Sequence, residues 1–166
     1  WLFEREPLNV QKRACLKFLR SAIVANNTAS IQWLIAAYSP FDNELDTLAH
    51  EVVLSGHVHL VPLFITAQNA SRYLSLACED VHMLETLYNL ASPPEPALDG
   101  LLATCAEHGC LDSVQWLIGK GVDVSECPKF TPTPLLRAAQ GGHLDTVKWR
   151  VGCAGASLGD RMADGR

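Results

Sequence analysis

Positively charged side chains are nearly missing from the middle of this 166-residue chain. Between residues 21 and 119, Arg72 is the only Lys or Arg, and it stands against eleven Asp and Glu. Such an acidic stretch repels the phosphate backbone, so we expect no nucleic-acid partner. The acidity is read as an ordinary solvated surface, with a cationic partner as the alternative.

Long apolar runs are also missing, because none approaches the roughly 18 residues that span a membrane. We therefore expect no membrane partner. The first residues, WLFEREPLNVQKR, are charged and predict no signal peptide. An initiator Met is lacking, so we expect the sequence to be part of a longer chain.

The six cysteines follow no tight framework, which favours reduced thiols and predicts a cytoplasmic, intracellular protein. Cys105, His108 and Cys110 place three soft ligands close together, and this spacing raises the alternative of zinc. Zinc usually needs four ligands in paired knuckles. We therefore expect these residues to be structural, with no metal and no cofactor.

The chain contains an internal repeat. The segment GCLDSVQWLI at 109–118 returns as GHLDTVKWRV at 142–151, a displacement of 33 residues. SIQWLI at 30–35 is a third copy, and Trp33, Trp116 and Trp149 fall into one position of the pattern, as does Trp1. Two weaker copies lack the Trp. A fixed period of this length predicts a repeat fold.

Each copy has a helical pattern, since Leu111, Val114, Leu117 and Ile118 lie on one helical face. A second helical segment precedes each copy. Gly109, Gly142 or Asn26 occupies the turn between them, where positive φ is tolerated. The unit is thus helix, turn, helix, loop, and neighbouring units must stack to bury their apolar faces. The five preceding segments are expected at 9–24, 45–55, 70–78, 98–107 and 134–140.

The last copy of the repeat resembles a known family. Its first helix begins Thr133-Pro134-Leu135-Leu136-Arg137-Ala138-Ala139, where Thr133 suits the cap and Pro134 the first helical position. With the following Gly142-His143 turn, it resembles the ankyrin repeat. The resemblance is clear over 98–151 and weaker over 1–97. It implies an all-α solenoid of about five stacked helix-turn-helix repeats over 1–151, followed by a flexible Gly-rich tail at 152–166.

Three residues depart from the family pattern. Leu136 replaces the usual His, so the family's Thr–His hydrogen bond cannot form there. Pro62 falls inside a second helix and is expected to kink or shorten it. Arg150 takes a position that is Leu117 in another copy, which predicts that this face ends the stack and is exposed.

The resemblance implies a scaffold that binds another protein through loop tips and the exposed side of its first helices. We expect a monomer without catalytic activity. Mapped onto the best copies, the partner-binding residues are expected to be Thr104, Glu107, Lys129, Phe130, Arg137 and Gln140.

Two other functions compete with a binding scaffold. Gly155-Ala156-Ser157-Leu158-Gly159 fits the G-x-S-x-G nucleophile elbow of a small hydrolase, but no His follows Ser157. The chain is alternatively a structural spacer in a longer repeat protein.

Two surface features also have competing interpretations. Lys12, Arg13, Lys17 and Arg20 form a basic helix face, which is read as solvated rather than as a site for a membrane or an acidic partner. The repeated tryptophans are expected to pack between repeats rather than to anchor a ligand.

Overall fold

The structure, a computed structural model, describes residues 8–38, 42–93, 95–122 and 133–153. Every regular element within these ranges is a helix, which confirms the all-α prediction. None of the helices described is both long enough and apolar enough to cross a membrane. The chain divides into two units, unit 1 (Trp1–Asn69) and unit 2 (Ala70–Arg166), and each is described by itself.

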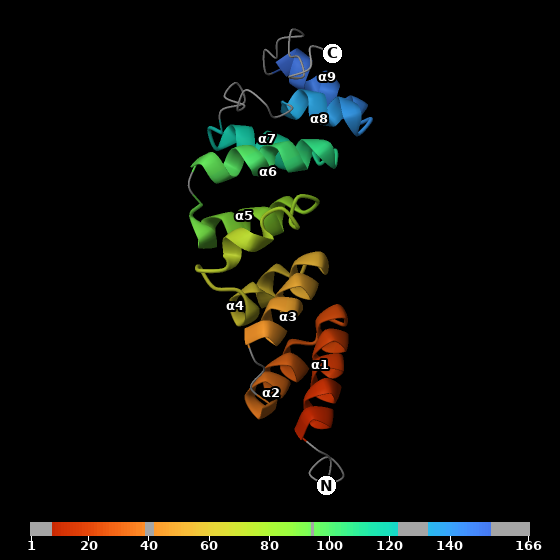
Figure 1. Cartoon of the computed structure of the whole chain (residues 1–166), viewed down its shortest axis with the longest axis vertical. Coiled ribbons are helices and arrows are strands. Elements are labelled where there is room, and N and C mark those ends of the chain that lie inside the picture. Colours follow the sequence, from red (N-terminus) through yellow and green to blue (C-terminus); the bar gives the residue numbers. More distant parts are fainter. Residues whose placement is uncertain (1–7, 39–41, 94, 123–132, 154–166) are drawn as a thin grey trace. The chain divides into compact units, whose positions relative to one another are not determined.

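Unit 1 contains two helical hairpins (Figure 1). The first hairpin packs against the second mainly through its first helix, and the second hairpin closes on a short helical segment. Leu19, Ile31, Leu48 and Leu60 are fully buried in the core that these hairpins share. The elements are α1 (Leu8–Val24), α2 (Thr28–Tyr38), α3 (Asp42–Leu54), η2 (Val58–Leu60) and α4 (Val61–Phe64).

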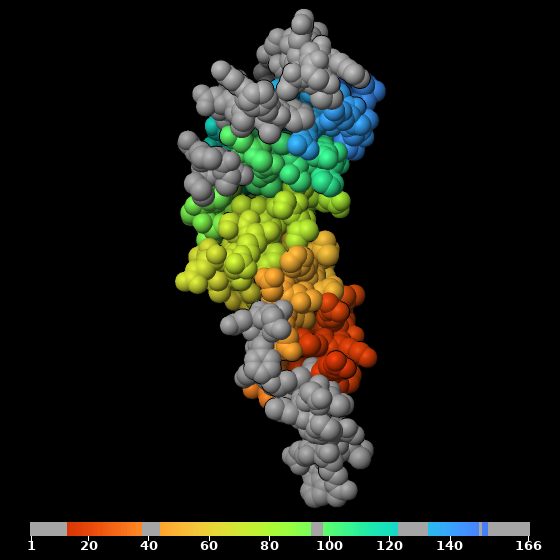
Figure 2. Space-filling model, viewed as in Figure 1, coloured from red at the N-terminus to blue at the C-terminus, as the bar shows by residue number. Residues whose placement is uncertain are grey.

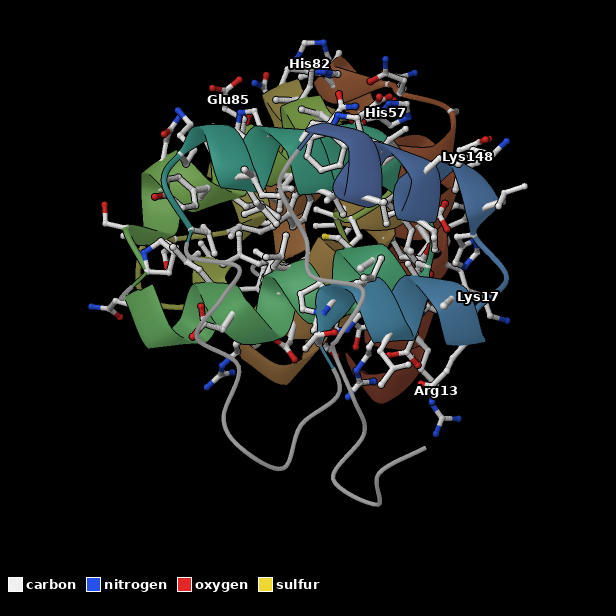
Figure 3. The ribbon with its side chains drawn as sticks, turned by 90° about the horizontal axis from the view of Figure 1, so that it is seen from above. Arg13, Lys17, His57, His82, Glu85 and Lys148 are labelled. Carbon is white, nitrogen blue, oxygen red and sulfur yellow. The ribbon has the colours of Figure 1, made fainter. Side chains whose placement is uncertain are left out.

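Unit 2 continues with η3 (Ala70–Tyr73), α5 (Val81–Ala91), α6 (Glu95–Glu107), α7 (Leu111–Gly119), α8 (Pro134–Gln140) and α9 (Leu144–Cys153). The first helices α6 and α8 contact each other extensively and lie on one side, with the second helices α7 and α9 on the other (Figure 3). In the space-filling view, green α6 lies directly against blue α8 (Figure 2). Leu102, Leu117 and Ala138 are buried between these layers.

The turns inside the hairpins are built alike. Asn26, Gly56, Gly109 and Gly142 have φ values of 55°, 69°, 72° and 77°, as the sequence pattern predicts for three of them. After three of these residues, the next N–H donates to the carbonyl five residues back, each time at 2.9 Å. This bond closes the C-terminus of the first helix in the manner of a Schellman motif. The three donor and acceptor pairs are Asn27 and Ala22, Cys110 and Cys105, and His143 and Ala138.

The predicted start of α8 is also confirmed. Thr133 has extended backbone, and its Oγ1 accepts a hydrogen bond from the Leu136 N–H at 3.3 Å. Pro134 follows in the first turn, where a missing N–H has no cost. Pro62 likewise lies in the first turn of α4, which has only four residues, so the predicted shortening is confirmed.

Four of the five predicted first helices are confirmed as α1, α3, α6 and α8. The prediction over 70–78 is wrong, because only η3 and a series of turns at 74–79 are found there. This copy is shorter than the others, and it buries Tyr73 and Cys78 without completing an α-helix. Gly152 and Cys153, which are predicted to begin the flexible tail, belong to α9 instead. The side chain of Arg150 and the rest of the expected tail lie outside the described residues.

The tryptophan prediction holds only in part. Trp116 of α7 packs edge-on against Tyr88 of α5, with ring centroids 5.1 Å apart, as expected for packing between repeats. Trp33 of α2 is instead 65% exposed, so the expectation is wrong there. The physical reason is its place in the array. Trp116 packs against Tyr88 of α5, the second helix of the preceding repeat. In the described part of the chain, no second helix comes before α2 that could cover Trp33 in the same way.

We predict that Leu117→Ala lowers the free energy of unfolding by about 2–5 kcal/mol, because it leaves a cavity at a fully buried position. Leu144→Ala is the matched control, since Leu144 is 60% exposed and its truncation costs under about 0.5 kcal/mol. Urea denaturation followed by circular dichroism measures both. Equal costs for the two variants contradict the assigned core.

Candidate functional site

The C-terminal ends of α6 and α8 bring together four of the six residues expected to bind a partner. Arg137 of α8 donates from Nη1 to the Glu107 carboxylate of α6, which forms an ion pair between consecutive repeats. Thr104 lies one turn before Glu107, and Gln140 lies one turn after Arg137 and is exposed. We name these four residues the first-helix surface. Lys129 and Phe130, the other two, fall outside the described residues.

Thr104 is tied to its own helix. Its hydroxyl donates to the Gly100 carbonyl at 2.9 Å, and its carbonyl accepts from His108 Nδ1 at 2.9 Å. These bonds fix the end of α6 and leave the side chain half-buried. Thr104 therefore offers shape and a hydroxyl acceptor to a partner rather than a free donor.

The Glu107–Arg137 pair is the charged feature of this surface. Its side chains remain 49% and 33% exposed, so water screens the pair and its own contribution to stability is about 0–1 kcal/mol. Arg137 Nε, in contrast, is buried and has no hydrogen-bond partner in the described part of the chain. Packing thus holds the base of the guanidinium, while Nη1 reaches the Glu107 carboxylate and the side chain as a whole stays 33% exposed. This is the geometry in which Arg recognises carboxylates.

Beneath the ion pair, His143 joins the two repeats. Its Nε2 donates to the Glu107 carbonyl at 2.7 Å. The imidazole occupies space that two glycines leave open. A Cβ on Gly109 would come within 2.3 Å of the ring, and one on Gly141 would come within 2.6 Å of the Glu107 carbonyl.

The second helices of unit 2 carry a further cluster that the sequence pattern does not reveal. Lys120 Nζ lies 5.0 Å from the centroid of the Trp116 ring and 3.8 Å from Glu85 Oε1 of α5. The spacing of Trp116 and Lys120 places them on one helix face, but Glu85 comes from another repeat. Because these groups bind one another at the junction of α5 and α7, we interpret the cluster as a contact that holds two repeats together.

A charged groove of about 470 Å³ lies between the first helices of unit 1. Arg13, Lys17 and Arg20 of α1 line it, together with Glu44 and Thr47 of α3. Arg13 and Lys17 project outward from α1 (Figure 3), and Arg20 Nε lies 3.4 Å from Glu51 Oε1. The sequence predicts the basic helix face, whereas the acidic residues opposite it are identified only by the fold.

An open apolar groove of about 620 Å³ lies between α1 and α2, with Phe18 and Trp33 on its rim. Its lining is mostly small or apolar and carries no charged group. This groove lacks the convergent polar groups of a catalytic pocket.

Of the three residues suspected of metal binding, Cys105 is buried, Cys110 is half-buried and His108 is exposed. Cys105 is fully buried at the position that Ala138 takes in the next repeat, and Cys110 lies in the turn. Within the described residues, no three His, Cys, Asp or Glu side chains are arranged to hold a metal ion. The Gly155, Ser157 and Gly159 motif falls beyond the described part.

Comparison with known proteins supports the ankyrin resemblance. Residues 102–149 match the family model described as ankyrin repeats (many copies). The match covers the second half of α6, all of α7 and α8, and most of α9. It includes the turn glycines and the His143 contact. No curated protein matches the chain. Ankyrin repeats generally mediate protein–protein interaction.

We predict that Gly109→Ala destabilises the protein more than Gly142→Ala does. Both glycines have positive φ, which costs an Ala about 1 kcal/mol. Only at Gly109 would the new methyl group also meet the His143 ring, adding about 1–3 kcal/mol. Chemical denaturation of the two variants measures the difference.

The control is a double-mutant cycle with His143→Ala. The extra cost of Gly109→Ala disappears in that background, because the ring that the methyl group meets is gone. An extra cost that persists there contradicts the proposed contact between the turn and the imidazole.

Proposed function

We propose that this chain is a protein-binding scaffold without catalytic activity, and that its partner contacts the first-helix surface of unit 2. The single observation that carries the proposal is the partly exposed Glu107–Arg137 pair at the junction of α6 and α8. It offers opposite charges, with exposed Gln140 beside them, on two helices that pack against each other.

The position of the pair supports recognition rather than cohesion. The repeats already hold together through buried residues such as Leu102 and Ala138 and through the His143 hydrogen bond. An exposed ion pair adds little stability, so its charges are available to a partner at small cost. Arg is also among the residues that most often dominate binding energy at protein interfaces. Lys129 and Phe130, which the sequence also predicts to contact a partner, lie outside the described residues.

The charged groove of unit 1 supports the same kind of use. It too lies between two first helices, α1 and α3, and it combines cations with Glu44. First helices thus carry charged surface features in both units, a groove in unit 1 and an ion pair in unit 2. We propose that a partner of either surface contacts it by matching charges, which favours specificity and rapid association.

We predict that Arg137→Glu weakens binding of the partner by at least about tenfold, because it places two carboxylates together and removes an interface Arg. Lys148→Glu on α9 is the matched control, since it makes the same charge change at an exposed residue on the second-helix side (Figure 3). Binding proteins are isolated from a cell extract on immobilised full-length chain at physiological salt. Their affinities for each variant are then measured by calorimetry.

A partner that is lost with Arg137→Glu and retained with Lys148→Glu supports the proposal, provided that both variants melt like the wild type. Equal binding to both variants contradicts the assigned surface. If no protein is enriched on the wild-type chain, the spacer function is favoured and the scaffold is rejected.

A further inference from the structure

Two cysteine side chains of unit 2 lie in contact. Cys78 belongs to the turns at 74–79 and Cys105 to α6, and their Sγ atoms are 3.0 Å apart although 27 positions separate them in the sequence. Both are buried, with exposed fractions of 3% and 0%. A disulfide has its sulfur atoms about 2.05 Å apart, so closing this gap takes a movement of about 1 Å.

The backbone around both thiols is fixed by the α6–α7 hairpin. The buried Ser113 hydroxyl, at the start of α7, donates to the Cys78 carbonyl and holds the turn segment. The Cys110 N–H donates to the Cys105 carbonyl at 2.9 Å. The two sulfur atoms therefore do not depend on a flexible loop to meet. Their approach is built into the junction between consecutive repeats.

The two thiols are chemically unequal. The Cys105 S–H donates to Cys78 Sγ, which lowers the pKa of Cys78 from its ordinary value, and the nearby His108 acts in the same direction. Burial and Glu79 oppose this shift without reversing it. The same hydrogen bond, together with burial, raises the pKa of Cys105. Cys78 is thus the better nucleophile of the pair, because the thiolate is the reactive form.

A third thiol lies nearby and is less reactive. Desolvation raises the pKa of Cys110 to about 11, with Cys78 and Glu79 adding to the shift. Cys110 is half-buried and therefore easier to reach than the pair, yet it holds its proton more firmly at neutral pH. Accessibility and acidity thus favour different cysteines, and an experiment can separate them.

We propose that Cys78 and Cys105 are a site of oxidative modification, at which hydrogen peroxide converts the two thiols into an intramolecular disulfide. The proposal rests on the contact between the two sulfur atoms and on the backbone bonds that maintain it. It is independent of the partner-binding surface.

The reaction proceeds in two balanced steps. The Cys78 thiolate attacks one peroxide oxygen, the O–O bond breaks, and the released hydroxide takes a proton to leave as water. Cys78 is then a sulfenic acid. The Cys105 sulfur, as it loses its proton, attacks the Cys78 sulfur, the S–O bond breaks, and a second water leaves. Two thiols are oxidised, and one peroxide is reduced to two waters.

The disulfide would close a loop that contains all of α5. It would covalently tie the incomplete copy of the repeat at 70–91, where only η3 and turns replace a first helix, to α6 of the next copy. A crosslink of this length restricts the unfolded chain and stabilises the folded one. Peroxide is therefore expected to strengthen the least regular part of unit 2.

The test treats the full chain with hydrogen peroxide, blocks the remaining thiols with iodoacetamide in denaturant, and maps peptides without reduction by mass spectrometry. We expect a linked peptide pair containing Cys78 and Cys105, lighter by two hydrogens than the separate peptides. The melting temperature is expected to rise by roughly 5–10 °C and to return to its starting value on reduction.

Variants assign the site. Cys78→Ser and Cys105→Ser are expected to lose both the linked peptide and the rise in melting temperature. The matched controls, Cys15→Ser and Cys110→Ser, are expected to retain both. The wild-type peptide map decides the matter even if a variant fails to fold. The proposal is overturned if peroxide oxidises the protein without producing the Cys78–Cys105 peptide, or if Cys110 is joined to either residue instead.

Discussion

A helical hairpin of this size has one apolar side and no means of covering it alone. In unit 2 the cover is the next hairpin, whose first helix α8 packs against α6. Leu102, Leu117 and Ala138 lose almost all contact with water there. Because each hairpin needs its neighbour, stability is distributed along the array as a series of junctions. Every other feature of the unit is arranged around these junctions.

Polar chemistry gives the junction its register. The hydrogen bond from His143 Nε2 to the Glu107 carbonyl joins the turn after α8 to the end of α6. The bond requires glycine at two positions. A Cβ on Gly109 would clash with the His143 ring, and one on Gly141 would clash with the Glu107 carbonyl. Four residues from two repeats thus specify how the repeats meet. Residues 102–149, which contain all four, are the part of the chain that matches the ankyrin family model.

The sequence predicts whatever depends on local chemistry. Positive φ at Gly109, the Thr133 cap and the pairing of helices follow from residue type and period. Contacts between repeats are harder to predict, because a period says which residues occupy the same position and not what lies opposite them. The exposed Trp33 and the Glu107–Arg137 pair are examples.

The shortened copy at 70–91 is the hardest one to predict from the sequence. Its register differs from that of its neighbours, so counting along the chain misassigns 70–78 as a helix. For the same reason, no spacing rule relates Cys78 to Cys105.

Glu107 serves the two repeats through separate atoms. Its carboxylate faces Arg137 at the surface, while its backbone carbonyl is engaged by His143 beneath. A ligand carboxylate that binds Arg137 in place of the Glu107 carboxylate therefore leaves the hydrogen bond from His143 to the Glu107 carbonyl intact. Glu107 thus contributes to the exposed charge of the surface through its side chain and to the contact between repeats through its backbone.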